Sequence, residues 1–97
     1  MNAQQHLLIK LAEECAEVQQ AITKSLLFGL DDCHPETNIC NLDAIKHELN
    51  DLFAVVEMLH SEGVDWRIDN DKVKLKKAKV EYWMKYAETK GILWDEG

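Results

Sequence analysis

The stretch that decides the fold is residues 7–26, which read LLIKLAEECAEVQQAITKSL. Its apolar residues recur at intervals of three and four, the period of one face of an α-helix. They are Leu7, Leu8, Leu11, Ala12, Cys15, Val18, Ile22 and Leu26. The pattern predicts a helix from about Gln4 to Phe28 that ends at Gly29, since glycine is the commonest helix-stopping residue.

The same spacing predicts two further helices. The first begins near Leu42 and ends at Gly63, and the second begins between Asp65 and Asp71 and ends near Lys90. Their apolar faces are formed by Ile45, Leu49, Leu52, Phe53, Val55, Val56 and Leu59, and by Val73, Val80, Trp83, Met84 and Ala87. Residues 29–41 contain Asp, Asn and Pro and are predicted to form a loop, or a loop with one short turn.

No alternating strand pattern and no internal repeat is visible, so the predicted class is all-α. A chain of 97 residues forms one domain at most, and we assign residues 1–97 to a single domain. Three amphipathic helices make a small core. We therefore expect a small helical bundle whose four-helix core is completed by dimerisation.

Composition excludes several classes of protein. The net charge of −7 argues against a nucleic acid polymer as partner, because binding to the phosphate backbone needs clustered Lys and Arg. No segment approaches the run of about 20 apolar residues that a membrane span needs. The three cysteines are an odd number without the spacing of a disulfide framework, which favours a cytoplasmic location.

Acidic residues border the apolar faces of the first two predicted helices. Glu13, Glu14 and Glu17 fall within an arc of about 100° on the first helix, and Glu48 and Asp51 lie about 60° apart on the second. If the two helices pack antiparallel through their apolar faces, these two edges converge. The alternative is that the acids form ordinary solvated faces, with Lys10 and Glu14 as an i,i+4 ion pair.

Converging carboxylates need a compensating charge, because like charges and burial both penalise the ionised form. A divalent cation supplies that charge. Oxygen ligands select hard ions, and Mg²⁺ in particular pairs a few carboxylates with substrate phosphates. The cluster therefore predicts a Mg²⁺ site for a phosphate-bearing substrate, with Mn²⁺ as the other candidate ion.

The acids and the apolar residues around them also resemble a known family. Leu11-Ala12-Glu13-Glu14-Cys15-Ala16-Glu17-Val18 and His47-Glu48-Leu49-Asn50-Asp51-Leu52-Phe53-Ala54-Val55-Val56 are similar to the E-E-x-x-E and E-x-x-D motifs of MazG-like all-α nucleoside triphosphate pyrophosphohydrolases. The resemblance implies dimers or tetramers in which two chains form the bundle. It also implies hydrolysis of a nucleoside triphosphate, often a deoxynucleotide, between the α- and β-phosphates, as in house-cleaning of nucleotide pools.

The resemblance assigns roles to the acids. It implies Mg²⁺ held by Glu14, Glu17, Glu48 and Asp51, and a catalytic group of Glu13, Glu14 and Glu17. A general base is needed to take the proton of the attacking water, and adjacent acids cannot be told apart for that role from sequence. The phosphoribosyl-ATP pyrophosphohydrolases resemble the same superfamily and offer an alternative substrate.

Further residues are candidates for substrate contacts. Lys24, Lys76 and Lys79 are placed to meet phosphates, although a basic helix face is more commonly solvated. Trp66, Trp83 and Trp94 could stack on a base, but an aromatic at helical spacing such as Trp83 is more often core. Cys33, His34 and Cys40 are too few and too irregular for zinc, so a structural or incidental role is expected for them.

Two rival functions use the same chain. Glu57 and His60 form an E-x-x-H pair that, doubled in a homodimer and joined by a glutamate from each first helix, would build a di-iron carboxylate bundle. The other rival is a non-catalytic helical interaction module, in which the acids are surface and the apolar residues 92–94 are a docking segment.

Overall fold

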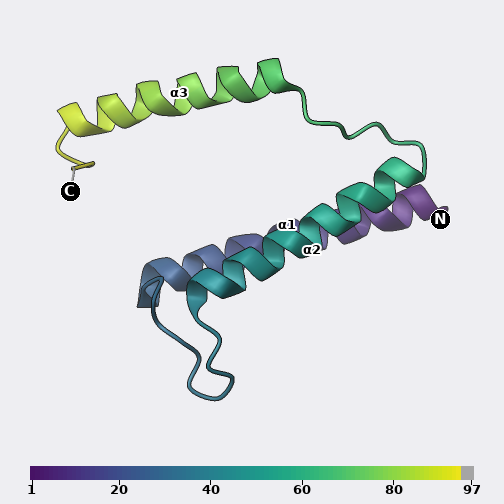
Figure 1. The fold of residues 1–97 in the computed structure, drawn as a ribbon, viewed down its shortest axis with the longest axis horizontal. Coiled ribbons are helices and arrows are strands. Elements are labelled where there is room, and N and C mark those ends of the chain that lie inside the picture. Colours follow the sequence, from purple (N-terminus) through teal and green to yellow (C-terminus); the bar gives the residue numbers. More distant parts are fainter. Residues whose placement is uncertain (95–97) are drawn as a thin grey trace. The chain divides into compact units, whose positions relative to one another are not determined.

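A computed structural model describes residues 1–94 of the chain, which are all-helical (Figure 1). The helices are α1 (Ala3–Phe28), α2 (Asn41–Ser61) and α3 (Asn70–Thr89). Within residues 1–94 the only strand-like pairing is an isolated antiparallel bridge between Cys33 and Cys40. The three predicted helices and the all-α class are therefore confirmed. In the same range, no helix has both the length and the apolar character needed to cross a membrane.

Local interactions account for both ends of α1 and for the start of α3. Asn2 and Gln5 form a capping box at the start of α1: Asn2 Oδ1 accepts from Gln5 N–H at 2.8 Å, and Asn2 N–H donates to Gln5 Oε1 at 3.0 Å. At the other end Gly29 has φ 99°, a conformation that costs glycine least. Asp69 caps α3 by accepting from the backbone N–H groups of Asp71 and Lys72.

The chain divides into two compact units, one comprising Met1–Trp66 and the other beginning at Arg67. In the first unit α1 and α2 lie side by side as an antiparallel hairpin (Figure 1). The open end is tied by Gln4 Nε2, which donates to the Glu62 carbonyl at 3.1 Å. The loop end is tied by Asn41 Nδ2, which donates to the Gly29 carbonyl at 2.7 Å.

The seam between the two helices differs in phase from the predicted apolar stripe. On α1 the buried and half-buried side chains recur at alternating intervals of four and three: Leu7, Leu11, Glu14, Val18, Ala21 and Ser25. The predicted stripe residues Ile22 and Leu26 are 42% and 82% exposed. On α2 the corresponding side chains include Ile45, Glu48, Leu52, Val55 and the fully buried Leu59. Carboxylates thus occupy positions inside the seam on both helices.

The second unit contains α3 and the segment that follows it. The chain folds back after Gly91, where the backbone N–H groups of Ile92 and Leu93 donate to the Ala87 carbonyl at 3.0 and 3.3 Å. α3 has no fully buried side chain. Trp83 was expected in the core but is 54% exposed, with its ring edge-on to Tyr82 and Tyr86. Val73, Val80 and Met84 of the predicted stripe are exposed as well, at 38%, 44% and 48%.

Candidate functional site

Carboxylates from both helices meet in the middle of the hairpin. Glu14 and Glu17 come from α1 and Glu48 and Asp51 from α2, and one oxygen atom of each lies within 4.8 Å of the others. Each pair has i,i+3 spacing, which puts both members on one side of its helix. Because the helices run antiparallel, the two pairs face each other, so the two carboxylate edges converge.

Glu13, the fifth predicted acid, lies outside this group. Lys10 Nζ is 3.0 Å from Glu13 Oε2, and both side chains are about half exposed, at 48% and 54%. The Lys10–Glu14 pair of the solvated-face alternative is not formed, because Glu14 turns into the seam and leaves Glu13 on the outer surface beside Lys10. An exposed pair of this kind contributes little to stability.

The pKa values of two carboxyl groups in the cluster are raised, by burial and by the neighbouring acids. Glu14 Oε2 and Glu48 Oε2 are buried and, as carboxylate oxygens, have no hydrogen-bond donor among residues 1–94. Burial raises the pKa of Glu14 above its ordinary value, and the negative charges of Glu17 and Asp51 add to the effect. For Glu48 a hydrogen bond with Glu17, burial and the same negative charges raise the pKa.

These features fit a hard divalent cation. An unpaired carboxylate oxygen away from water is unfavourable, and a cation bound by the group would satisfy both buried oxygens. The donor set consists of carboxylate oxygens, which suits Mg²⁺. Within the described residues the cluster is thus a candidate metal centre, and its carboxylate oxygens are the ligands that a hard divalent cation prefers.

His47 extends the centre, although sequence reasoning overlooked it. Its Nε2 lies 3.5 Å from Asp51 Oδ2, and His47, Glu48 and Asp51 form a second group of potential ligands. The i,i+4 spacing of His47 and Asp51 was the available signal. The His47 side chain is largely exposed, at 73%.

Glu57 and His60, the pair of the di-iron hypothesis, occupy a different part of α2. Within residues 1–94 neither belongs to a group that could hold a metal ion. His60 Nδ1 instead lies 4.0 Å from Asp65 Oδ1. The intramolecular geometry therefore gives this hypothesis no support.

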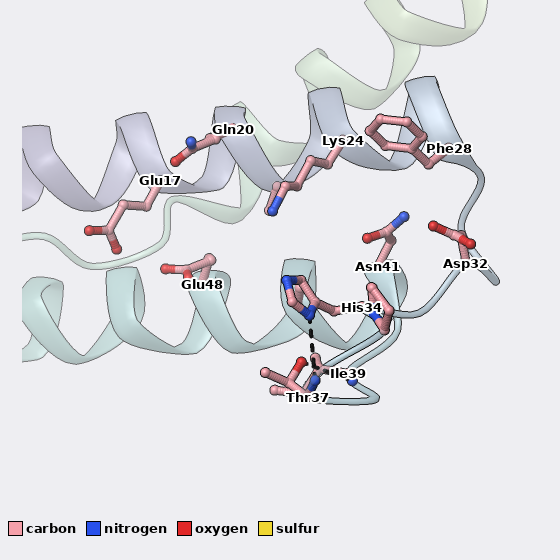
Figure 2. Close-up of a pocket in the computed structure, with 13 residues that line it drawn as sticks. Glu17, Gln20, Lys24, Phe28, Asp32, His34, Thr37, Ile39, Asn41 and Glu48 are labelled. Atoms are coloured by element: carbon pink, nitrogen blue, oxygen red, sulfur yellow. Dashed lines mark hydrogen bonds between the residues drawn. The ribbon is translucent and has the colours of Figure 1, made fainter.

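A pocket of about 670 Å³ adjoins the carboxylates (Figure 2). Glu17 and Glu48 belong both to the cluster and to the pocket wall, so the two are continuous. Lys24 also lines the pocket, and Figure 2 shows its side chain reaching from α1 towards α2. It has no ion-pair partner within the described part of the chain, which leaves its charge available to an anion.

The α1–α2 loop forms the far wall of this pocket and is stapled by a disulfide between Cys33 and Cys40. The odd cysteine count thus reflects one bonded pair inside the loop and one free, exposed residue, Cys15. With both loop thiols bonded to each other, a zinc role for them is excluded. The cysteines also no longer argue for a reducing compartment.

The remaining candidates lie elsewhere. Lys76 and Lys79 line a shallow groove of about 570 Å³ on the second unit, together with Trp83 and residues of the segment after α3. None of Trp66, Trp83 and Trp94 lines the pocket beside the carboxylates. The aromatic residue in that wall is Phe28, at the end of α1.

Comparison with known proteins adds no assignment. No protein-family model matches this sequence. Curated proteins and solved structures give no match either. Any function must therefore be argued from the carboxylate cluster and its pocket.

Proposed function

We propose that the chain is a MazG-like, Mg²⁺-dependent nucleoside triphosphate pyrophosphohydrolase that yields a nucleoside monophosphate and pyrophosphate. The observation that supports this most is the group of Glu14, Glu17, Glu48 and Asp51, whose oxygens lie within 4.8 Å and include two buried atoms without donors. A phosphate-handling enzyme needs such a cation site beside a cavity large enough for its substrate.

In this proposal the four acids hold Mg²⁺ or Mn²⁺. When bound, the ion orients the triphosphate, neutralises developing charge and lowers the pKa of the attacking water. Glu14 or Glu17 takes the proton of that water, and Lys24 contacts the phosphates from the adjoining wall. Glu13 is the weakest of the candidates, because its charge is already paired with Lys10.

The proposal also expects an oligomer. The stripe on α3 and side chains such as Leu26 on α1 are apolar and exposed, and a second copy would cover them as a four-helix core. Lys76 and Lys79 would then approach phosphates from α3. The enzyme would act on cytoplasmic nucleotide pools, where it would remove unwanted nucleotides.

The decisive experiment is a panel of natural and modified nucleoside triphosphates with and without Mg²⁺, scored for monophosphate and pyrophosphate. Glu14→Gln and Asp51→Asn should each lower kcat/KM by about 100-fold or more, because each removes a direct ligand. Glu57→Gln is the matched control, since it makes the same change on α2 outside the cluster and should leave kcat/KM unchanged. Helicity and oligomeric state should be the same in all variants.

Other outcomes separate the rivals. Nucleoside diphosphate and orthophosphate as products would refute cleavage between the α- and β-phosphates. Bound iron that is lost in His60→Ala would favour the di-iron bundle. Absence of any hydrolysis across the panel, with folding intact, would leave the interaction module.

A further inference from the structure

The pocket beside the carboxylates has a definite direction. Along α1 its wall runs through Glu17, Gln20, Lys24 and Phe28, which lie on one face of the helix. This row covers about 16 Å at the helical rise per residue. The acids stand at one end of the pocket, the lysine in the middle and the α1–α2 loop at the other end, as Figure 2 shows.

His34 presents a fixed hydrogen-bond donor at the loop end. Its Nδ1 accepts from the backbone N–H groups of Glu36 and Thr37 at 3.1 and 3.4 Å. A neutral imidazole whose Nδ1 is an acceptor carries its proton on Nε2. His34 lines the pocket, so the Nε2–H group is available to a ligand there (Figure 2).

Asn41 offers the complementary acceptor. Its Nδ2 donates to the Gly29 carbonyl at 2.7 Å, which fixes the orientation of the amide. Its Oδ1 accepts no hydrogen bond from the described part of the chain and stands in the pocket wall. Apolar surface beside these groups comes from Phe28, Pro35 and Ile39.

The loop is held in one shape by its own contacts. The Cys33–Cys40 disulfide encloses His34 and Ile39, whose backbone groups are also joined by a His34 N–H to Ile39 carbonyl bond of 2.9 Å. Asn38 turns the chain between them with φ 59°, a left-handed conformation that asparagine tolerates. A long loop with such internal bracing is more typical of a binding element than of a simple connection.

We propose that the loop end of this pocket binds the nucleobase of the substrate, with His34 Nε2–H and Asn41 Oδ1 hydrogen-bonding to the base edge. Nucleobases are planar and carry donors and acceptors side by side, which matches a donor and an acceptor set among apolar walls. Lys24 then lies between base and carboxylates, where the phosphates pass. This inference rests on the proposed function, because a triphosphate must occupy the carboxylate end.

Two substitutions of His34 test the donor, and the first of them keeps an acceptor for the loop's backbone N–H groups. In His34→Asn the amide oxygen takes the place of Nδ1, but nothing replaces Nε2–H. In His34→Gln a longer amide places an N–H group near the position of Nε2. His6 is an exposed histidine of α1, and His6→Asn is the matched control.

The readout is calorimetric binding, with Mg²⁺, of non-hydrolysable α,β-methylene nucleoside triphosphates and of inorganic tripolyphosphate. We expect the wild type to bind its preferred nucleotide at least about tenfold more tightly than tripolyphosphate. His34→Asn should lose about tenfold in affinity for that nucleotide and none for tripolyphosphate. His34→Gln should recover part of the loss, and His6→Asn should match the wild type.

Base recognition by the loop would be overturned if the wild type bound nucleotides and tripolyphosphate equally, or if His34→Asn weakened both probes alike or neither. The hydrolysis assay is scored separately. Base-selective binding without hydrolysis would refute the proposed activity while supporting the pocket assignment. Hydrolysis with base-independent binding would support the proposed activity and refute the pocket assignment.

Discussion

Glu14 and Glu48 occupy seam positions whose neighbours in the same register are Leu11, Val18 and Leu52. A carboxylate at such a position is partly removed from water and faces others of the same charge. Without a cation the seam is therefore weakest where the acids meet. Placing carboxylates in the seam therefore has two results. It gives the hairpin affinity for a cation, and it reduces the stability of the metal-free hairpin.

The raised pKa values of Glu14 and Glu48 predict how stability varies with pH in the presence of a chelator. The folded chain keeps protons on these groups at pH values where the unfolded chain, with the ordinary pKa of 4.5, has released them. Their contribution to stability is present below pH 4.5 and is lost as pH rises through the raised values. This loss of stability is measured as the Tm of the wild type and of Glu48→Gln, followed by circular dichroism from pH 4 to 8.

The expected result is a Tm that falls with rising pH more steeply for the wild type than for Glu48→Gln, which carries no titratable group at that position. Added Mg²⁺ should raise the Tm of the wild type most at the alkaline end, since it binds the ionised acids. Parallel curves for the two proteins would show that Glu48 does not titrate in this way.

The sequence predicted the four acids of the cluster but also placed Glu13 among them, which the structure does not. The i,i+3 pairs Glu14–Glu17 and Glu48–Asp51 were visible, and antiparallel packing brings them together. Glu13 could not be separated from Glu14 because adjacent helix residues differ by about 100°, comparable with the error in the phase of an apolar stripe. That phase is fixed by the partner helix, which the sequence of α1 alone does not contain.

At the scale of elements, the α1–α2 loop depends on its disulfide. The variant Cys33→Ser/Cys40→Ser should lower the free energy of unfolding by about 2 kcal/mol, because the crosslink limits the freedom of the unfolded chain. Urea unfolding measures the change. Cys15→Ser, at the free and exposed cysteine, is the control and should have no effect. A double variant as stable as the wild type would show that the crosslink contributes nothing to folding.

The helices were predictable and the loop was not. The ends of α1 and α3 follow from local signals, the Asn2–Gln5 capping box, Gly29 and Asp69. The loop instead depends on pairs such as Cys33–Cys40 and Asn41–Gly29, which have no periodicity that a sequence pattern could reveal. Consequently His34 could be noticed only as a possible zinc ligand, and its place in the pocket wall came from the structure.

For the whole molecule, the exposed apolar side chains of α3 predict association. Val80→Asp places a charge in the middle of that stripe and should shift the protein from dimer or tetramer to monomer. Ala78→Asp is the matched control, since it adds the same charge about 160° away around the helix and should leave the assembly intact. Sedimentation velocity gives the masses. A wild type that is monomeric at all concentrations would contradict a shared four-helix core.

The ties at the two ends of the hairpin have a kinetic consequence. Gln4–Glu62 and Asn41–Gly29 hold the ends of α1 and α2 together, while the acids repel one another halfway between. Because the two ends are held and the acids repel one another, the helices separate most easily in the middle of the hairpin. We expect a cation to enter when α1 and α2 separate locally beside the acids. Its rate of entry should then depend on this local opening and be independent of global unfolding.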